Sequence, residues 1–331
     1  MAYQIGLIGS TQYTLTCAQA LLHNRQFNVS WVLTPSAKPQ GRNQRLIPNP
    51  VQNWADRQKV TSVLINSIIN KSTQEQLQTI ILSNGRPDFL LVVDFGYLIP
   101  KWLIDLPNIK SLNIHPSDLP RWRGSSPAQF VLLYGEKITA VCLITLTEKF
   151  DQGDIVFKLP LSVNPDWTQT EYYQTCFSQI SHYLPDIFDK LANQQITPLG
   201  QIPASPTQTA RRISKDDSFI DWQNVMQARA GKETIVKPLS PLLNSVLAHL
   251  KKTNDNSSRP ALLLCQLIEQ ATRAFSPWPY LWTFVPTKTG QKRMKILHTS
   301  LDDLGQLKLE SVQIEGHQPT SINQVKNIIQ L

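Results

Sequence analysis

Apolar residues in the first part of the chain alternate between short continuous runs and helical spacing. The run over residues 5–9 is followed by apolar residues at helical spacing up to Leu22, and then by a second run over residues 29–33. This alternation favours β-α-β units and a parallel sheet. The run over residues 88–94 is almost uninterrupted, as in a strand that is buried on both faces. The predicted elements are strands over 5–9, 29–33, 61–65, 88–94, 109–114 and 140–144, and helices over 15–22, 51–58 and 73–82.

The second part of the chain has a different pattern. Apolar residues at three- and four-residue spacing over 168–191 predict one amphipathic helix, which Pro185 kinks. Residues 196–209 are rich in Pro, Gln, Ser and Thr, a composition typical of a linker. Short strands separated by turn residues follow and suggest a small β-barrel of the OB type. These strands are predicted over 281–285, 294–298 and 307–314.

Length and composition limit the classes of protein to consider. The 331 residues suggest two domains, which we place at 1–195 and 213–331 with a linker over 196–212. The four cysteines are widely scattered without a C-x-x-C pair, so we expect reduced thiols in a cytoplasmic protein and no metal site. We see neither a signal peptide nor an apolar run as long as a membrane span. The net charge of +8 allows a polyanionic partner such as nucleic acid.

The candidate chemistry lies at the ends of two predicted strands. Alternation along the strand that ends near residue 114 points Asn113 and His115 to the same face, and Pro116 biases His115 toward extended geometry. A lone histidine at a strand end is more often a satisfied packing residue than a catalytic one. The strand over 140–144, however, leads to Asp151, whose carboxylate can orient and tune a nearby imidazole.

Three short motifs together carry a family resemblance. They are Asn113-x-His115-Pro116-Ser117, then Leu119-Pro120-Arg121-Trp122-Arg123-Gly124, and finally Asp151-x-Gly153-Asp154. In combination they resemble the signature of formyltransferases that use 10-formyltetrahydrofolate, and the likeness covers nearly the whole chain. It is greatest to the branch of that family that formylates initiator methionyl-tRNA for translation initiation. The resemblance implies a Rossmann-like catalytic domain followed by an OB-like tRNA-binding domain.

The resemblance also assigns roles to individual residues. Asn113 would donate to the formyl oxygen, and His115 would transfer the proton and stabilise the developing charge. Asp151 would orient His115 and help to carry the proton from the attacking amine to the departing folate nitrogen, with no nucleophilic residue required. Cys142 lies among apolar neighbours in mid-strand and is interpreted as a packing residue. The folate would lie against residues of the loop after His115 and of the turn after the 88–94 strand: Ser117, Asp118, Leu119, Pro120, Tyr97 and Leu98. Without the resemblance, the sequence favours Tyr97 and Leu98 as core residues rather than ligand contacts.

A Pro-rich loop over residues 34–50 is the candidate tRNA contact. Its composition alone also fits a solvated surface loop. By the resemblance, Arg42 is its best candidate contact, supported by Lys38 and Arg45. Arg121 and Arg123 either hold the loop that follows His115 or meet the acceptor end of the RNA.

The chain also departs from the family pattern. Asp118 replaces a usual Leu, Ala140 a Gly, Cys142 a Thr and Lys149 a Gly. In the second domain, the chain carries an insertion within about 223–260, for which residues 242–252 predict an extra helix.

Two alternatives remain open, and one further expectation concerns assembly. The chain could formylate an amino sugar nucleotide, or it could be a degenerate RNA-binding homologue that has lost its folate site. We expect a monomer.

Overall fold

The computed structural model describes residues 2–40, 44–254, 262–288, 290–325 and 329. The chain divides into two compact units. The first comprises Met1–Pro127, Ile138–Leu161 and Tyr173–Thr209, and the second comprises Ala128–Lys137, Ser162–Tyr172 and Ala210–Leu331. The domain boundaries inferred from the sequence remain a prediction.

A seven-stranded sheet forms the core of the first unit, in the order β5-β2-β1-β6-β7-β8-β9. Pairing is parallel from β5 to β7 and antiparallel between β7 and β8, which confirms the mostly parallel sheet. Every residue of β6 is buried, as its apolar run predicts. The strands are β1 (Tyr3–Gly9), β2 (Phe27–Pro35), β5 (Thr61–Ile65), β6 (Phe89–Val93), β7 (Lys110–His115), β8 (Ile138–Thr145) and β9 (Ile155–Ser162).

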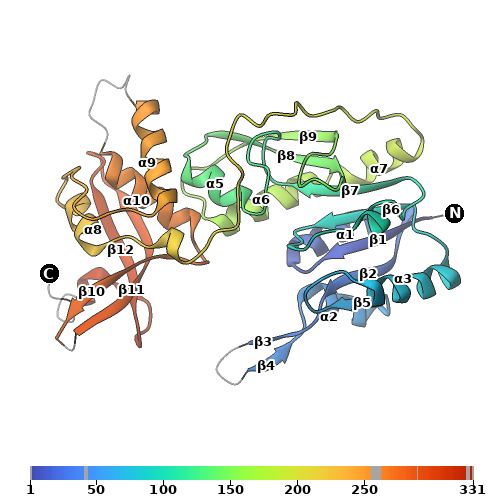
Figure 1. Ribbon diagram of the computed structural model, residues 1–331, viewed down its shortest axis with the longest axis horizontal. Coiled ribbons are helices and arrows are strands. Elements are labelled where there is room, and N and C mark those ends of the chain that lie inside the picture. Colours follow the sequence, from blue (N-terminus) through green and yellow to red (C-terminus); the bar gives the residue numbers. More distant parts are fainter. Residues whose placement is uncertain (1, 41–43, 255–261, 289, 326–328, 330–331) are drawn as a thin grey trace. The chain divides into compact units, whose positions relative to one another are not determined.

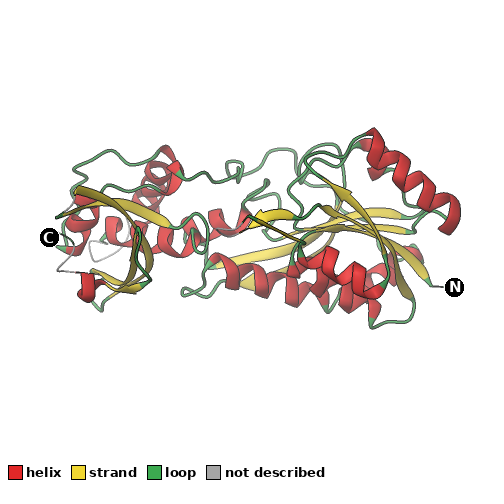
Figure 2. Cartoon of the chain, turned by 90° about the horizontal axis from the view of Figure 1, so that it is seen from below, coloured by secondary structure: helices red, strands yellow, loops and turns green. Residues whose placement is uncertain are grey.

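Helices lie on both faces of this sheet (Figure 2). Local sequence accounts for their ends: Asn49 caps α2 by accepting from the backbone N–H groups of Val51 and Gln52, and Pro50 occupies the first turn. A short hairpin of β3 (Lys38–Gln40) and β4 (Arg45–Ile47) follows β2. The helices are α1 (Gln12–Leu22), α2 (Pro50–Gln58), α3 (Lys71–Asn84), α4 (Lys101–Ile104), α5 (Pro127–Leu133), α6 (Gln169–Ser181) and α7 (Leu184–Ala192).

Two local features differ from the sequence-based expectation. The single kinked helix predicted over 168–191 is wrong, because α6 ends at Ser181 and α7 starts anew at Leu184. Pro185 lies in the first turn of α7, where its missing N–H costs no helical hydrogen bond. Strand β9 was not predicted at all. It contains Pro160 and few buried residues, which suit its place at the edge of the sheet.

The second unit combines helices with a small antiparallel sheet in the order β10-β11-β12-β13 (Figure 1). This sheet confirms the small β domain, while its closure into an OB-type barrel remains a prediction. Helix α9 (Pro241–Asn254) confirms the extra helix predicted over 242–252. The other elements are η1 (Asp216–Ser218), α8 (Trp222–Arg229), α10 (Leu263–Ala274), β10 (Leu281–Thr287), β11 (Gly290–Leu301), β12 (Leu307–Ile314), β13 (Thr320–Ser321) and η2 (Ile322–Val325).

Candidate active site

Strand β7 carries two of the predicted catalytic residues to the carboxyl edge of the parallel strands. Asn113 pairs in register with Val92 of β6, and His115 is the last residue of β7. Open α/β sheets hold their ligands at this edge. Asn113 is half-buried, whereas the whole His115 residue is only 4% exposed.

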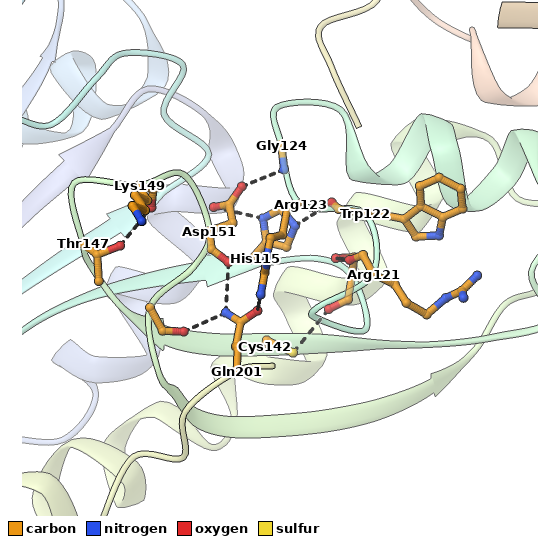
Figure 3. Close-up of polar contacts among 12 residues, drawn as sticks. His115, Arg121, Trp122, Arg123, Gly124, Cys142, Thr147, Lys149, Asp151 and Gln201 are labelled. Carbon is orange, nitrogen blue, oxygen red and sulfur yellow. Dashed lines mark hydrogen bonds and ion pairs between the residues drawn. The ribbon is translucent and has the colours of Figure 1, made fainter. Parts of the chain in front are cut away.

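The imidazole of His115 lies between two acceptors (Figure 3). Its Nε2 lies 3.1 Å from the backbone carbonyl oxygen of Trp122, and since a carbonyl oxygen only accepts, Nε2 carries a proton. Its Nδ1 lies 3.5 Å from Oδ1 of Asp151, which is an ion-pair distance slightly longer than a hydrogen bond. Nε2 is therefore anchored to the protein, and Nδ1 is the nitrogen that faces Asp151.

Asp151 is held in an unusual backbone conformation. Its φ is +53°, in the left-handed region that non-glycine residues seldom adopt. Its Oδ2 accepts a hydrogen bond of 2.8 Å from the backbone N–H of Gly124, which fixes the carboxylate. Next to it, Gly153 approaches β8 so closely that an added Cβ would lie 1.6 Å from the carbonyl oxygen of Thr145. Only glycine fits this turn, and the turn aims Asp151 at His115.

A pocket opens beside these groups. Asn113 and Asp151 both line it, whereas His115 is not among the lining residues. The pocket encloses about 70 Å³ and is bordered by the loop that joins β8 to Asp151. Its lining residues are Val92, Phe95, Tyr97, Leu98, Ile99, Asn113, 144–151 and Gly153.

The predicted folate residues divide into two groups. Tyr97 and Leu98 line the pocket, and Leu98 is 61% exposed. The loop of Ser117, Asp118, Leu119 and Pro120 does not line it, and its buried Ser117 and Leu119 act inside the protein. The Ser117 hydroxyl, for example, donates to the carbonyl oxygen of Arg121.

The departure from the family pattern at Asp118 has a partner in this chain. Lys158 of β9 donates to Oδ1 of Asp118 at 2.7 Å and to the carbonyl oxygen of Leu119 at 2.8 Å. Lys158 thus compensates the carboxylate that stands in place of a usual Leu, and it also ties the loop to β9.

The predicted tRNA contacts lie in different environments. Lys38 and Arg45 are exposed on the β3–β4 hairpin, while Arg42 lies outside the described residues. Arg121 lies over the ring of Trp122, 5.6 Å from its centroid. Arg123 is only 8% exposed, and its guanidinium donates to Gln201 and to two carbonyl oxygens. Arg123 was expected either to hold the loop that follows His115 or to meet the RNA, and these hydrogen bonds favour the first role.

Cys142 is a packing residue, as expected. Burial raises the pKa of its thiol to about 12, and its S–H donates to the carbonyl oxygen of Ser117. A thiol of this kind is not a nucleophile near neutral pH.

Two features are absent from the part of the chain that the structure describes. No group of three or more His, Cys, Asp or Glu side chains in it is arranged to hold a metal ion. None of the helices in the described ranges has the length and apolarity needed to cross a membrane.

Comparison with known proteins places this site in a family. A family model described as formyl transferase matches residues 6–187, a segment that contains Asn113, His115 and Asp151. The chain belongs to the formyl transferase family. It is therefore an enzyme that transfers a one-carbon group.

Similarity to individual proteins extends beyond that segment. The methionyl-tRNA formyltransferase of Marinobacter nauticus is 26% identical over 98% of this chain and 96% of its own length. The solved methionyl-tRNA formyltransferase from Clostridium thermocellum shares the fold, with a TM-score of 0.53 at 18% identity, over 95% of this chain and 99% of that one. HypX from Aquifex aeolicus, solved with tetrahydrofolic acid, also shares the fold, with a TM-score of 0.55 at 12% identity. That match covers 98% of this chain and 48% of the HypX chain.

Gln201 is the residue of this site that sequence reasoning missed. It lies in the Pro-, Gln-, Ser- and Thr-rich segment interpreted as a linker, yet its amide contacts both Arg123 and the Asp151 loop. Nothing in the local pattern marks it, because a single Gln in such a segment has no distinguishing neighbour.

Proposed function

We propose that the chain transfers the formyl group of 10-formyltetrahydrofolate to the α-amino group of initiator methionyl-tRNA. The observation that carries this proposal is the similarity to a methionyl-tRNA formyltransferase over almost the full length of both chains, the second unit included. The product, formyl-methionyl-tRNA, serves translation initiation, and the reaction would take place in the cytoplasm.

The pocket beside Asn113 is the proposed site of the formyl donor. Enzymes of this family use substrates of the formyl-tetrahydrofolate type, and the pocket combines apolar side chains with the amide of Asn113 and the carboxylate of Asp151. Its enclosed volume of about 70 Å³ is smaller than that of typical cofactor pockets, which measure roughly 300 Å³ or more. A folate bound here would therefore extend out of the pocket, past the exposed 147–150 segment at its rim.

Asn113 is the proposed donor to the developing oxyanion. The attacking amine adds to the formyl carbon and forms a tetrahedral intermediate whose oxygen carries negative charge. A neutral amide donor aimed at that oxygen stabilises it, and loss of one such donor typically costs about 3 kcal/mol. Asn113 is half-buried and lines the pocket, which suits this role.

The His115–Asp151 pair is the proposed route for the proton. An α-amino group has a pKa of about 7.7–8, so roughly a tenth to a sixth of it is already neutral at pH 7 and no strong base is needed to produce the attacking amine. Once the new C–N bond has formed, the former amine must lose a proton, and N10 of the departing folate must gain one. Asp151 faces the pocket, so its carboxylate can take the proton from the former amine and then return it to N10 of the departing folate. Between these two steps the protonated carboxyl can donate to Nδ1 of His115, which lies 3.5 Å from Oδ1.

The tRNA is proposed to meet the β3–β4 hairpin. Exposed cations such as Lys38 and Arg45 neutralise backbone phosphates without reading sequence. Arg42 belongs to the same proposed set. Arg123 does not, because the protein itself occupies its guanidinium.

The test offers purified protein 10-formyltetrahydrofolate together with either methionyl-tRNA or an amino sugar nucleotide. The proposal expects formyl-methionyl-tRNA and no formylated sugar. The reverse pattern would assign the chain to the sugar enzymes. Calorimetry with the folate separates a third outcome, since a degenerate homologue would show no folate binding and no product with either acceptor.

A further inference from the structure

A strap of extended chain crosses the catalytic loops of the first unit. We define the strap as residues 199–207; it starts on β9, where the backbones of Leu199 and Ile155 exchange two hydrogen bonds. Figure 1 shows the chain running along the β8–β9 edge of the sheet after α7. This segment was expected to be a linker, but its polar side chains are engaged. The hydroxyl of Ser205, for example, donates to the carbonyl oxygen of Pro120 at 2.7 Å.

Arg123 joins the strap to the loop that follows His115. Its Nη1 donates to the carbonyl oxygen of Pro203 at 2.9 Å, and its Nη2 donates to that of Ile202 at 2.9 Å. Its Nε and Nη2 both donate to Oε1 of Gln201, at 3.1 and 2.8 Å. A planar guanidinium holds such a set of oxygens in fixed directions, which a lysine ammonium would not do.

Gln201 uses the full hydrogen-bonding capacity of its amide (Figure 3). Its oxygen accepts both bonds from Arg123, and its nitrogen donates to the carbonyl oxygens of Asp151 at 2.9 Å and Gly153 at 2.7 Å. Only one orientation of the amide fits, because a guanidinium only donates and carbonyl oxygens only accept. Glutamate would fill the same space, but it would turn a carboxylate oxygen toward the two carbonyl oxygens.

These hydrogen bonds hold the backbone conformation that directs the side chain of Asp151. The left-handed φ of +53° at Asp151 is intrinsically unfavourable and persists only where the surroundings impose it. Gln201 binds the carbonyl groups of Asp151 and Gly153 and so fixes this turn. This backbone turn then directs the carboxylate of Asp151 to the N–H of Gly124 and to His115.

We propose that Gln201 is a positioning residue of the formyl transfer reaction. It acts through Asp151, with Arg123 as the group that orients its amide. This inference rests on the proposed function for its kinetic consequence, although its structural consequence can be measured without any activity.

The kinetic experiment compares Gln201→Ala and Gln201→Glu with the wild type. Both variants should lower kcat by about 10- to 100-fold, the scale of a small misplacement of a catalytic group, and leave the KM for methionyl-tRNA unchanged. In an Asp151→Ala background, Gln201→Ala should have no further effect, because the group that it positions is absent. Gln195→Ala, an exposed glutamine just before the strap, is the matched control and should behave as wild type.

Hydrogen exchange supplies the readout that is independent of activity. In both Gln201 variants the amide of Gly124, which is bonded to Asp151 Oδ2, should exchange faster, while the core amides of β6 keep their wild-type rates. Unchanged Gly124 exchange, or equal acceleration in β6, would overturn the positioning role even if the enzyme formylated a different acceptor. Additive losses of kcat in the double variant would overturn it as well.

Discussion

The side chain of Asn113 offers the pocket a neutral hydrogen-bond donor at the end of β7. It is held by a strand that pairs with β6 on one side and β8 on the other, so its position is set by sheet geometry rather than by a loop. Preorganisation of this kind makes a donor effective, because no reorganisation is needed when the oxyanion forms.

Replacement of Asn113 by alanine should lower kcat by about 10²- to 10³-fold with little change in either KM, because the lost hydrogen bond forms only as charge develops. Steady-state kinetics in which the concentration of each substrate is varied separate the effect on kcat from the effect on the two KM values. Asn193→Ala, which alters an exposed asparagine bonded within its own helix region, is the control and should be silent. A rise in KM at constant kcat would instead assign Asn113 to ground-state binding.

The four thiols Cys17, Cys142, Cys176 and Cys265 should resist modification in the native protein. All four are buried, and burial raises the pKa of Cys142 to about 12. Since the thiolate is the reactive form, a thiol reagent at pH 8 should label them only after denaturation. Cys142→Ala should accordingly retain formyl transfer. Rapid native labelling of Cys142 with loss of activity would contradict its role as a packing residue.

Among the structural elements, the short turn η1 of the second unit contributes electrostatically to stability. Asp217 in η1 accepts hydrogen bonds from the guanidinium of Arg211 and from the backbone and hydroxyl of Ser214. Its side chain is 8% exposed. Chiefly because of the Arg211 contact, the pKa of Asp217 is lowered to about 2.

A carboxyl group with a lowered folded-state pKa stabilises the protein above its unfolded pKa of about 3.9 and loses that contribution as pH falls through the folded value. Asp217→Asn should therefore reduce the free energy of unfolding of this unit by about 2 kcal/mol at pH 7, and the difference should shrink between about pH 4 and pH 2. Hydrogen exchange of the η1 and α8 amides as a function of pH measures this. The exposed neighbour variant Asp216→Asn should show neither effect. A difference that persists unchanged at pH 2 would contradict the ionic origin.

The elements also show which features the sequence could predict. The strands β1, β5, β6, β7 and β8 follow from apolar runs, and placing Asn113 and His115 on one face follows from strand alternation. Strand β9 and the strap lack such a signal, because both are half-exposed and interrupted by prolines. The contact of Gln201 with Asp151 joins residues fifty positions apart, so only tertiary structure reveals it.

At the scale of the whole molecule, the net charge of +8 favours association with a polyanion. Within that charge, the exposed cations of the β3–β4 hairpin are the ones that we propose to contact RNA. The resemblance, and not composition, singled out the loop over residues 34–50 that contains this hairpin, since its residues alone also fit a solvated loop.

Arg45→Ala should weaken methionyl-tRNA binding and reduce the slope of log affinity against log salt by about 1, the signature of one lost phosphate contact. Binding titrations at several salt concentrations measure both quantities. Arg57→Ala, which removes an exposed cation at the end of α2, is the charge-matched control and should leave the slope unchanged. Equal effects of the two variants would indicate general electrostatics rather than a hairpin contact.

A labelled formyl group can be followed from 10-formyltetrahydrofolate onto methionyl-tRNA, which measures the proposed reaction itself. The wild type should produce labelled formyl-methionyl-tRNA, and Asn113→Ala should produce it at least about 10²-fold more slowly. Absence of labelled product with the wild type, in an assay in which a known methionyl-tRNA formyltransferase is active, would contradict the proposed function.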